Sequence, residues 1–247
     1  MELKNKVVLV TGSSRGIGRA TALAFTREGC DVVVNYLQGK AKAEAVVEEV
    51  KKLGQKALAI QADVAKLTEF KVMVNRTVKE FGRLDVLVNN AGIIIQTNQD
   101  FQKIDDKVFD RTIGVNLKGA FNGIKLAAPI MKKQGQGRII NLASVFGQLG
   151  GARVAAYTAA KAAIESLTKG FAKELAPEIT VNSVAPAVCQ TDMTKGAGPA
   201  LIQYFQDNTP LKRMAEPEEI AEAIVFLAKS DFITGQILNV DGGYGLK

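Results

Sequence analysis

The sequence predicts a single α/β domain built on a doubly wound, seven-stranded parallel sheet with helices on both faces. Short runs rich in β-branched residues recur along the chain and alternate with longer helical stretches, as in successive βαβ units. These runs are apolar without alternation, which is typical of strands buried on both faces. No linker, short repeat or low-complexity tract interrupts the 247 residues, so we expect one domain spanning residues 1–247.

Each expected strand is a short apolar run that follows a turn or a helix end. Glycines close several of the intervening helical stretches, as at Gly29, Gly54 and Gly82. The expected strands are Val7–Val10, Val32–Val34, Ala57–Ile60, Leu84–Val88, Arg138–Leu142, Thr180–Val184 and Ile237–Val240.

Composition narrows the class of protein. Hydrophobic residues make up 47% and charged residues 23%, which supplies a full core. The apolar run Val7–Val10 is too short for a signal peptide or a membrane span, and Cys30 and Cys189 have neither metal-binding nor redox spacing. We therefore expect a cytoplasmic protein with no membrane partner and no metal site.

The net charge of +7 raises the question of nucleic acid binding. The lysines are scattered and gather mostly at helix ends, such as Lys51-Lys52 and Lys132-Lys133, where they favour the negative end of the helix dipole. We interpret the charge as a solvated basic surface and expect no nucleic acid partner. Such a surface would still attract phosphorylated cofactors or acidic partners.

A glycine-rich loop, TGSSRGIGRA, follows the first expected strand and leads directly into a helical pattern. Its glycines, Gly12, Gly16 and Gly18, suit a tight turn, close approach of a pyrophosphate and close packing of helix on strand. A helix N-terminus also offers free N–H groups to phosphates. The loop lacks the Gly-Lys-Ser/Thr ending of a nucleotide hydrolase, so it favours a bound dinucleotide.

Polar residues end two further strands. Asp63 lies just past the third strand, where an adenine edge could be held, and Asn89-Asn90-Ala91-Gly92 ends the fourth. Ligands of open α/β sheets bind at the carboxyl ends of strands, so both segments are candidates for the same site.

Tyr157 and Lys161 interrupt the alanine-rich helical segment AAYTAAKAA and are four residues apart, on one helical face. The chain has no histidine. Tyrosine has an ordinary pKa of about 10, and a nearby positive charge lowers it. We therefore expect Lys161 to lower the pKa of Tyr157, so that the pair does the acid–base work that histidine does elsewhere.

Taken together, these motifs resemble the short-chain dehydrogenase/reductase family over the whole chain. The matching residues are Thr11-Gly12-x-x-x-Gly16-x-Gly18, Asp63, Asn89 to Gly92, Asn116, Ser144 (thirteen residues before Tyr157), Tyr157-x-x-x-Lys161 and the segment Pro186 to Thr191. The C-terminal stretch from PEEIAEAIVFLAKS to ITGQILNVDGGY is most similar to the β-ketoacyl-[acyl carrier protein] reductases of that family. The resemblance implies a Rossmann fold, a nicotinamide cofactor and a homotetramer.

The resemblance also implies a role for each catalytic candidate. Tyr157 would give its proton to a substrate carbonyl as hydride arrives, and Ser144 would hydrogen-bond the carbonyl oxygen. Lys161 would lower the pKa of Tyr157 and bond the nicotinamide ribose, and Asn116 would hold a water that relays protons to Lys161. The residues expected to bind the cofactor are Gly12, Ser14, Arg15, Gly16, Ile17, Gly18, Asn35, Tyr36, Asp63, Val64, Asn90, Ala91, Gly92, Tyr157, Lys161, Pro186, Val188 and Thr191.

The end of the second strand predicts which nicotinamide cofactor is used. Enzymes that use NAD place an acidic residue there for the ribose 2′-hydroxyl, whereas this chain has Asn35 and Tyr36. Arg15, in the glycine loop, could meet a 2′-phosphate. Both observations favour NADP(H).

The substrate is less constrained. An apolar rim suits the acyl chain of a 3-oxoacyl thioester, which an acidic acyl carrier protein would deliver to the basic surface, including Lys132 and Lys133. Alternatives are a sugar, polyol or small ketone as substrate, and a non-catalytic dinucleotide sensor. The rim residues are Ile93, Ile94, Ile95, Phe146, Leu149, Val188 and Met193.

The chain departs from the pattern of the resembled family at three places. Ala187 stands where a glycine usually follows Pro186, an arginine-aspartate pair common after Gly92 is missing, and the turn Pro177–Val181 is short.

Overall fold

A computed structural model describes residues 1–95, 102, 104–195 and 198–246 of the chain, apart from the side chains of Met193 and Lys195. In this part of the chain all seven expected strands are present, with ends within two residues of the prediction. The strands are β1 (Val7–Val10), β2 (Asp31–Tyr36), β3 (Ala57–Gln61), β4 (Val86–Asn89), β5 (Gly137–Leu142), β6 (Ile179–Pro186) and β7 (Ile237–Val240).

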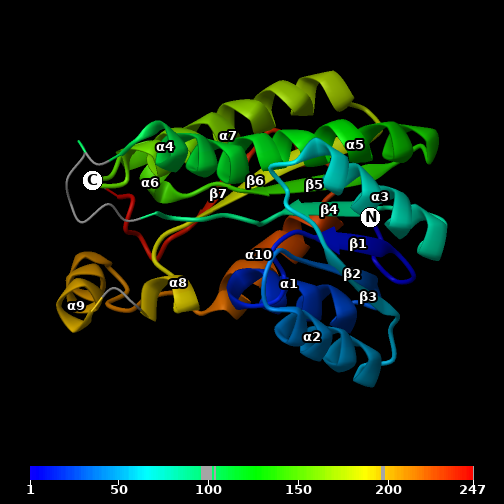
Figure 1. Ribbon diagram of the computed structural model, residues 1–247, viewed down its shortest axis with the longest axis horizontal. Helices are drawn as coiled ribbons and strands as arrows, with labels where there is room; N and C mark the ends of the chain where they lie inside the picture. Colours follow the sequence, from blue (N-terminus) through cyan, green and yellow to red (C-terminus); the bar gives the residue numbers. More distant parts are fainter. Residues whose placement is uncertain (96–101, 103, 196–197, 247) are drawn as a thin grey trace.

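The strands form one sheet in the order β3-β2-β1-β4-β5-β6-β7, with every neighbouring pair parallel. This is the predicted doubly wound arrangement, and the order reverses between β1 and β4. A crevice for ligands is expected at such a reversal, outside the carboxyl ends of the strands. In Figure 1 those ends lie on the side of the molecule where α4, α6, α8 and α9 gather.

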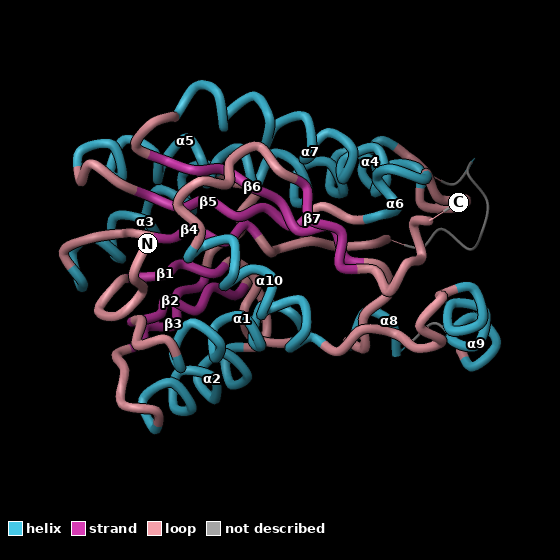
Figure 2. Tube along the Cα trace, turned by 180° about the vertical axis from the view of Figure 1, so that it is seen from behind, coloured by secondary structure: helices cyan, strands magenta, loops and turns pink. Residues whose placement is uncertain are grey.

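Helices cover both faces of the sheet, as Figures 1 and 2 show. On one face α1, α2 and α10 pack on a core that includes Phe25, Val46 and Ile224, and on the other α3, α5 and α7 pack on Phe70, Ile124 and Met131. The described helices are α1 (Gly16–Arg27), α2 (Lys40–Lys52), α3 (Leu67–Phe81), α4 (Asp106–Ile113), α5 (Gly119–Lys133), α6 (Val145–Leu149), α7 (Ala155–Leu175), α8 (Asp192–Lys195), α9 (Pro199–Asn208) and α10 (Pro217–Lys229), with a π-helical segment, η2 (Gly114–Lys118), before α5.

No helix in the described part of the chain is long and apolar enough to span a bilayer. The described residues also hold no group of three or more histidine, cysteine, aspartate or glutamate side chains arranged to bind a metal ion.

An apolar groove lies on the outer surface between α5 and α7. Phe121 is 41% exposed, and its ring centroid lies 6.0 Å from that of Phe171. Beside this pair, small exposed residues on α7 follow a helical stripe that would let another helix approach closely: Ala159, Ala162, Ser166 and Gly170. The groove is lined by Phe121, Ile124, Lys125, Ala128, Pro129, Lys132, Phe171, Glu174 and Leu175.

We expect this groove to be covered by a second copy of the chain, because exposed apolar patches of this kind mark interfaces. Light scattering at micromolar concentration should therefore give the mass of an oligomer, with the tetramer as the expected state. Phe121→Lys should shift the population toward monomer, since it would bury a charge in the interface. A monomeric mass for the unaltered protein would contradict the prediction.

Candidate active site

The glycine loop takes a backbone shape that only glycine adopts easily. Gly12 and Gly16 have φ values of 63° and 55°, in the left-handed region. Gly18 is constrained by space instead, because a Cβ there would lie 2.5 Å from both the Gly12 carbonyl oxygen and the Asn90 side-chain nitrogen. The loop therefore brings the N-terminus of α1 close against the end of β4.

The N-terminus of α1 is suited to an anion. Arg15 occupies the N-cap position without a side-chain cap hydrogen bond, and the first turn of α1 holds no acidic residue. Its N–H groups and positive dipole end are therefore available to a phosphate. Thr191, after β6, faces the same point, with its Cγ2 3.4 Å from where a Gly16 Cβ would stand. Ser14 and Ile17 are partly exposed on this surface, as expected for residues beside a bound pyrophosphate.

Arg15 is exposed, and within the described part of the chain its side chain makes no hydrogen bond or ion pair. Lys40 and Lys42, which sequence reasoning did not single out, begin α2 on the strand-end side of the sheet and are also exposed. Lys40 pairs with Glu44 at 3.5 Å and Lys42 with Asp192 at 3.4 Å. Within this positive rim at the end of β2, Arg15 is therefore the cation without an ion pair among the described residues.

The segment after β4 is fastened to the glycine loop by side-chain hydrogen bonds. The Thr11 hydroxyl accepts from the backbone N–H groups of Asn90 at 2.9 Å and Ala91 at 3.0 Å. The Asn90 side chain donates to the Thr11 carbonyl at 2.7 Å and the Gly12 carbonyl at 3.2 Å. Asn90, Ala91 and Gly92 are therefore held against the glycine loop at the end of β4, and their contact with a cofactor stays a prediction.

Asn35 and Tyr36 lie at the predicted strand end, but their side chains point into the protein. Asn35 is 1% exposed; its Oδ1 accepts from the Gly12 N–H at 3.0 Å, and its Nδ2 donates to the Ala62 carbonyl at 3.1 Å. Tyr36 is 7% exposed and belongs to the hydrophobic core. Asn35 thus holds the backbone of the glycine loop at Gly12. Neither the Asn35 side chain nor the Tyr36 side chain is exposed to a ligand.

Asp63 is at the predicted position after β3 and is buried. Its carboxylate accepts from Arg111 of α4 at 2.8 Å and from the Ala65 N–H at 3.0 Å. The neighbouring Val64 is also buried, and its carbonyl accepts from the Asn122 side chain at 2.9 Å. Arg111 gave no signal in the sequence, because its pairing with Asp63 depends on how α4 packs against the loop that follows β3.

The four catalytic candidates are brought together at the carboxyl ends of β4 and β5. Ser144 follows β5 and caps α6; its Oγ accepts from the Phe146 N–H at 3.3 Å and donates to the Pro186 carbonyl at 3.4 Å. It lies close enough to the Tyr157 hydroxyl to affect the pKa of that group. Lys161 is 4% exposed; its Nζ lies 5.7 Å from the Tyr157 ring centroid and donates to the Leu142 carbonyl. The expected grouping of Ser144, Tyr157 and Lys161 is therefore present.

Burial dominates the electrostatics of this pair. It raises the pKa of the Tyr157 hydroxyl above its ordinary value, and the hydrogen bond with Ser144 opposes that rise. It also lowers the pKa of Lys161 to about 8. The Tyr157 pKa is therefore shifted opposite to the expected lowering, because the loss of water around the phenol dominates and Lys161, directed at the Leu142 carbonyl, does not offset it.

Asn116 lies in the π-helical segment η2 and not in a regular helix. π-Helical turns frequently occur at functional sites. The Asn116 amide donates to the carbonyls of Ile93 and Thr112, both at 2.9 Å, and accepts from the Ile93 N–H at 3.2 Å. Its Oδ1 would lie 2.8 Å from a Cβ on Gly92, and the Lys161 Nζ lies 3.7 Å from the same point. Asn116 is therefore next to Lys161, and its role as a water relay stays a prediction.

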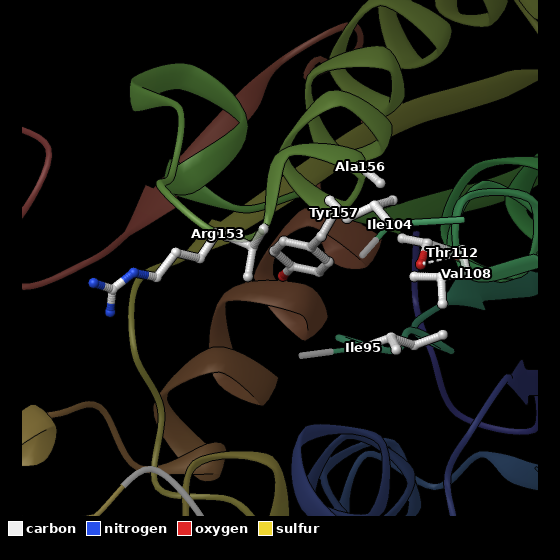
Figure 3. A pocket seen from close by; sticks show the side chains of 8 residues that line it. Ile95, Ile104, Val108, Thr112, Arg153, Ala156 and Tyr157 are labelled. Carbon is white, nitrogen blue, oxygen red and sulfur yellow. Dashed lines mark hydrogen bonds between the residues drawn. The ribbon is translucent and has the colours of Figure 1, made fainter. Parts of the chain in front are cut away.

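A small pocket opens beside the Tyr157 ring, and most of its wall is apolar (Figure 3). Arg153 lies at its edge with its guanidinium directed away from the cavity. Ile95 was expected in this wall, whereas Ile104 and Val108 were not, because their place beside Tyr157 follows from the packing of α4. The lining residues are Ile95, Ile104, Val108, Thr112, Arg153, Val154, Ala156 and Tyr157.

An aromatic cluster borders the site next to Ser144. The ring centroid of Phe146 lies 5.7 Å from that of Tyr244 and 6.1 Å from that of Phe205 on α9. The Asp241 carboxylate holds the C-terminal turn by accepting from the N–H groups of Gly243 and Gly245, both at 2.9 Å. Phe146 was an expected rim residue, and the side chain of Met193 lies outside what the structure describes.

Pro186 ends β6, and Val188 is partly exposed beside it, on the crevice side of the sheet. Ala187 is not among the described residues that have positive φ, so the position does not require glycine. The replacement of the usual glycine is accommodated without backbone strain.

Comparison with known proteins agrees with this geometry. A family profile described as enoyl-(acyl carrier protein) reductase matches residues 12–245. The chain is 47% identical to a 3-oxoacyl-[acyl-carrier-protein] reductase FabG of Staphylococcus epidermidis, over 97% of this chain and 98% of the relative. It is 46% identical to a 3-oxoacyl-[acyl-carrier-protein] reductase of Synechocystis sp., over 98% of this chain and 97% of the relative.

A solved structure shows the same fold. The crystal structure of a candidate short-chain alcohol dehydrogenase from Sinorhizobium meliloti 1021 superposes with a TM-score of 0.93 at 31% identity, covering 98% of this chain and 97% of that one. The chain therefore belongs to the short-chain dehydrogenase/reductase family of oxidoreductases.

Proposed function

We propose that the chain is an NADPH-dependent ketoreductase that reduces a 3-oxoacyl thioester, held on an acyl carrier protein, to the 3-hydroxyacyl product in fatty acid synthesis. One observation carries the proposal: Ser144, Tyr157 and Lys161 lie together at the carboxyl ends of the strands, where the N-terminus of α1 is open to an anion. The names of the two reductase relatives support the same substrate class.

The residues divide the work as follows. A nicotinamide dinucleotide, when bound, supplies the hydride; the loop from Gly12 to Gly18 and Thr191 would hold it. Because the pKa of Tyr157 is raised, its hydroxyl stays protonated near neutrality and is ready to give its proton to the carbonyl oxygen. Ser144 donates a hydrogen bond to that oxygen as negative charge develops.

Lys161 supplies positive charge below its pKa of about 8. A cation beside Tyr157 favours the phenolate that remains after proton transfer, which lowers the barrier for that step. Asn116, bonded to Ile93 and next to Lys161, would hold the water through which the pair regains its proton.

The positive rim at the end of β2 supports NADP(H) as the cofactor. Arg15 is exposed and free of ion pairs within the described residues, and Asn35 offers no carboxylate to a ribose 2′-hydroxyl. A 2′-phosphate would meet Arg15 and the lysines that begin α2.

The apolar pocket wall supports an acyl substrate better than a sugar, since Ile95, Ile104 and Val108 offer no hydrogen-bond partners through their side chains. The expectation that Lys132 and Lys133 steer an acidic carrier protein to the site does not fit their position in the fold. Lys132 and Lys133 end α5 just before β5 begins, so they lie at the amino edge of the sheet, far from the site. Arg153, exposed beside Tyr157, is the better placed cation.

Tyr157→Phe should reduce kcat at least 10³-fold, on the order of the loss expected for a positioned acid. The dissociation constant for NADPH, measured by its fluorescence, should change by less than about threefold, because removing one hydroxyl leaves the glycine loop intact. Near-normal turnover in this variant would contradict the proposed acid.

NADPH should be preferred over NADH, and Arg15→Ala should reduce the ratio of their kcat/KM values by about tenfold, the effect of losing one charge-assisted hydrogen bond to phosphate. Lys173→Ala is a matched control, since Lys173 is an exposed cation at the far end of α7. Equal efficiency of the two cofactors with the unaltered protein would refute the NADP(H) assignment.

Among substrates, kcat/KM should be highest for a carrier-bound acetoacetyl thioester and should fall as salt rises, because the carrier is acidic. Arg153→Ala should raise KM for the carrier-bound substrate alone, and Lys133→Ala should leave it unchanged. A panel with keto-sugars, small ketones and a 2-enoyl thioester completes the test. If a keto-sugar or ketone is the best substrate, the carrier assignment fails while the cofactor and catalytic roles remain.

A further inference from the structure

Helix α7 carries both Tyr157 and Lys161, so its rotation and its axial position against the sheet decide where these two groups lie. The face of α7 that packs on the sheet is made largely of small side chains, with Ala156, Ala160 and Ala172 all buried. Small side chains interlock little with their neighbours, so apolar packing alone allows a helix of this kind to slide or rotate.

A buried threonine supplies the missing directional contact. Thr168 lies on the same face of α7, seven residues beyond Lys161, and is 0% exposed. Its hydroxyl bonds the Ile164 carbonyl at 2.8 Å, the Asn141 side chain of β5 at 2.9 Å and the Ser183 hydroxyl of β6 at 2.7 Å.

These three bonds use the whole capacity of the hydroxyl. Thr168 donates its single proton to the Ile164 carbonyl and accepts from Asn141 and from Ser183. Asn141 and Ser183 are also 0% exposed, so a donor that lost its partner here would have no water to bond instead, which is unfavourable.

The network continues toward the site. The Asn141 Oδ1 accepts from the Asn89 side chain at 2.9 Å, and Asn89 ends β4 immediately before the segment Asn90 to Gly92 that lines the crevice. The other side-chain oxygen of this link, Asn89 Oδ1, is buried with no hydrogen-bond partner among the described residues. One chain of buried side chains therefore joins α7 to β4, β5 and β6.

Seven residues along a helix correspond to about 10 Å. Helix α7 is thus held to β5 at two points. Near the site Lys161 bonds the Leu142 carbonyl, and about two turns further on Thr168 bonds Asn141. The second point contains no group that takes part in the proposed chemistry.

We propose that Thr168, bonded to Asn141 and Ser183, is a positioning residue that fixes the register of α7 and through it the placement of the Tyr157 hydroxyl and the Lys161 ammonium. The inference rests on the proposed function, since it assigns Thr168 an effect on the proton-transfer pair.

The test compares Thr168→Val with Thr77→Val. Thr77 of α3 is also 0% exposed, and among the described residues its hydroxyl bonds only the Met73 carbonyl, four residues back, at 3.0 Å. Both variants lose a buried helical threonine, and both should lower Tm. Thr168→Val alone should lower kcat by about tenfold, the order expected for a small displacement of catalytic groups, with the dissociation constant for NADPH within about twofold. Thr168→Ser should restore kcat, because it keeps the hydroxyl.

A second measurement needs no substrate. Ultraviolet difference titration against a Tyr157→Phe background reports the pKa of Tyr157, and Thr168→Val should move that pKa toward its ordinary value as water reaches the phenol. The groups facing this hydroxyl from the described elements are Ser144 and Lys161, both unchanged in the variant. This readout separates failure of the positioning role from failure of the proposed reaction.

If Thr168→Val does not fold, Ser183→Ala removes one of the three partners and should change kcat and the Tyr157 titration in the same direction by a smaller factor. Folded Thr168→Val or Ser183→Ala protein with kcat and Tyr157 titration unchanged, and only Tm lowered as in Thr77→Val, would overturn the proposal.

Discussion

The absence of a side chain at Gly18 is the constraint on which the rest of the site depends. A Cβ there would collide with the Gly12 carbonyl and the Asn90 amide, so only glycine lets α1 begin this close to the end of β4. The close approach allows Asn90 to bond the backbone of Thr11 and Gly12 and allows Thr11 to bond the backbone of Asn90 and Ala91. The glycine loop and the β4 turn therefore form one rigid wall of the crevice.

The sequence predicted the fold, and it predicted which catalytic candidates would be brought together, because both depend on local patterns. Apolar runs identified every strand, and parallel pairing then brought Gly12, Asn90, Ser144 and Thr191 to one edge of the sheet. What the sequence could not separate was a polar residue facing a ligand from a polar residue facing the backbone. Asn35 lies at the expected strand end, yet its side-chain amide hydrogen-bonds the backbone of Gly12 and Ala62 and is not free to bond a ligand.

The ion pair between Asp63 and Arg111 and the pocket wall formed by Ile104 and Val108 were missed for a related reason. These contacts require α4 and the residues just before it to pack on α7 beside Tyr157 and to meet the loop that follows β3, and no spacing along the chain encodes that packing. The sign of the Tyr157 pKa shift was wrong because the spacing of tyrosine and lysine reports their proximity but not the loss of water around them. In the folded site, burial disfavours charge on both groups, so it favours a protonated phenol at Tyr157 and works against the charge on Lys161.

The same competition between burial and charge explains why a polar network lies beneath such an alanine-rich helix. Burial lowers the pKa of Lys161 to about 8, so the charge-assisted bond from its ammonium to the Leu142 carbonyl weakens when the lysine loses its proton. A neutral network of amide and hydroxyl groups does not titrate in this range, and its bonds gain strength from the dry interior. Placing the directional contact at Thr168, away from the reacting groups, keeps the position of the helix independent of the protonation state of the site.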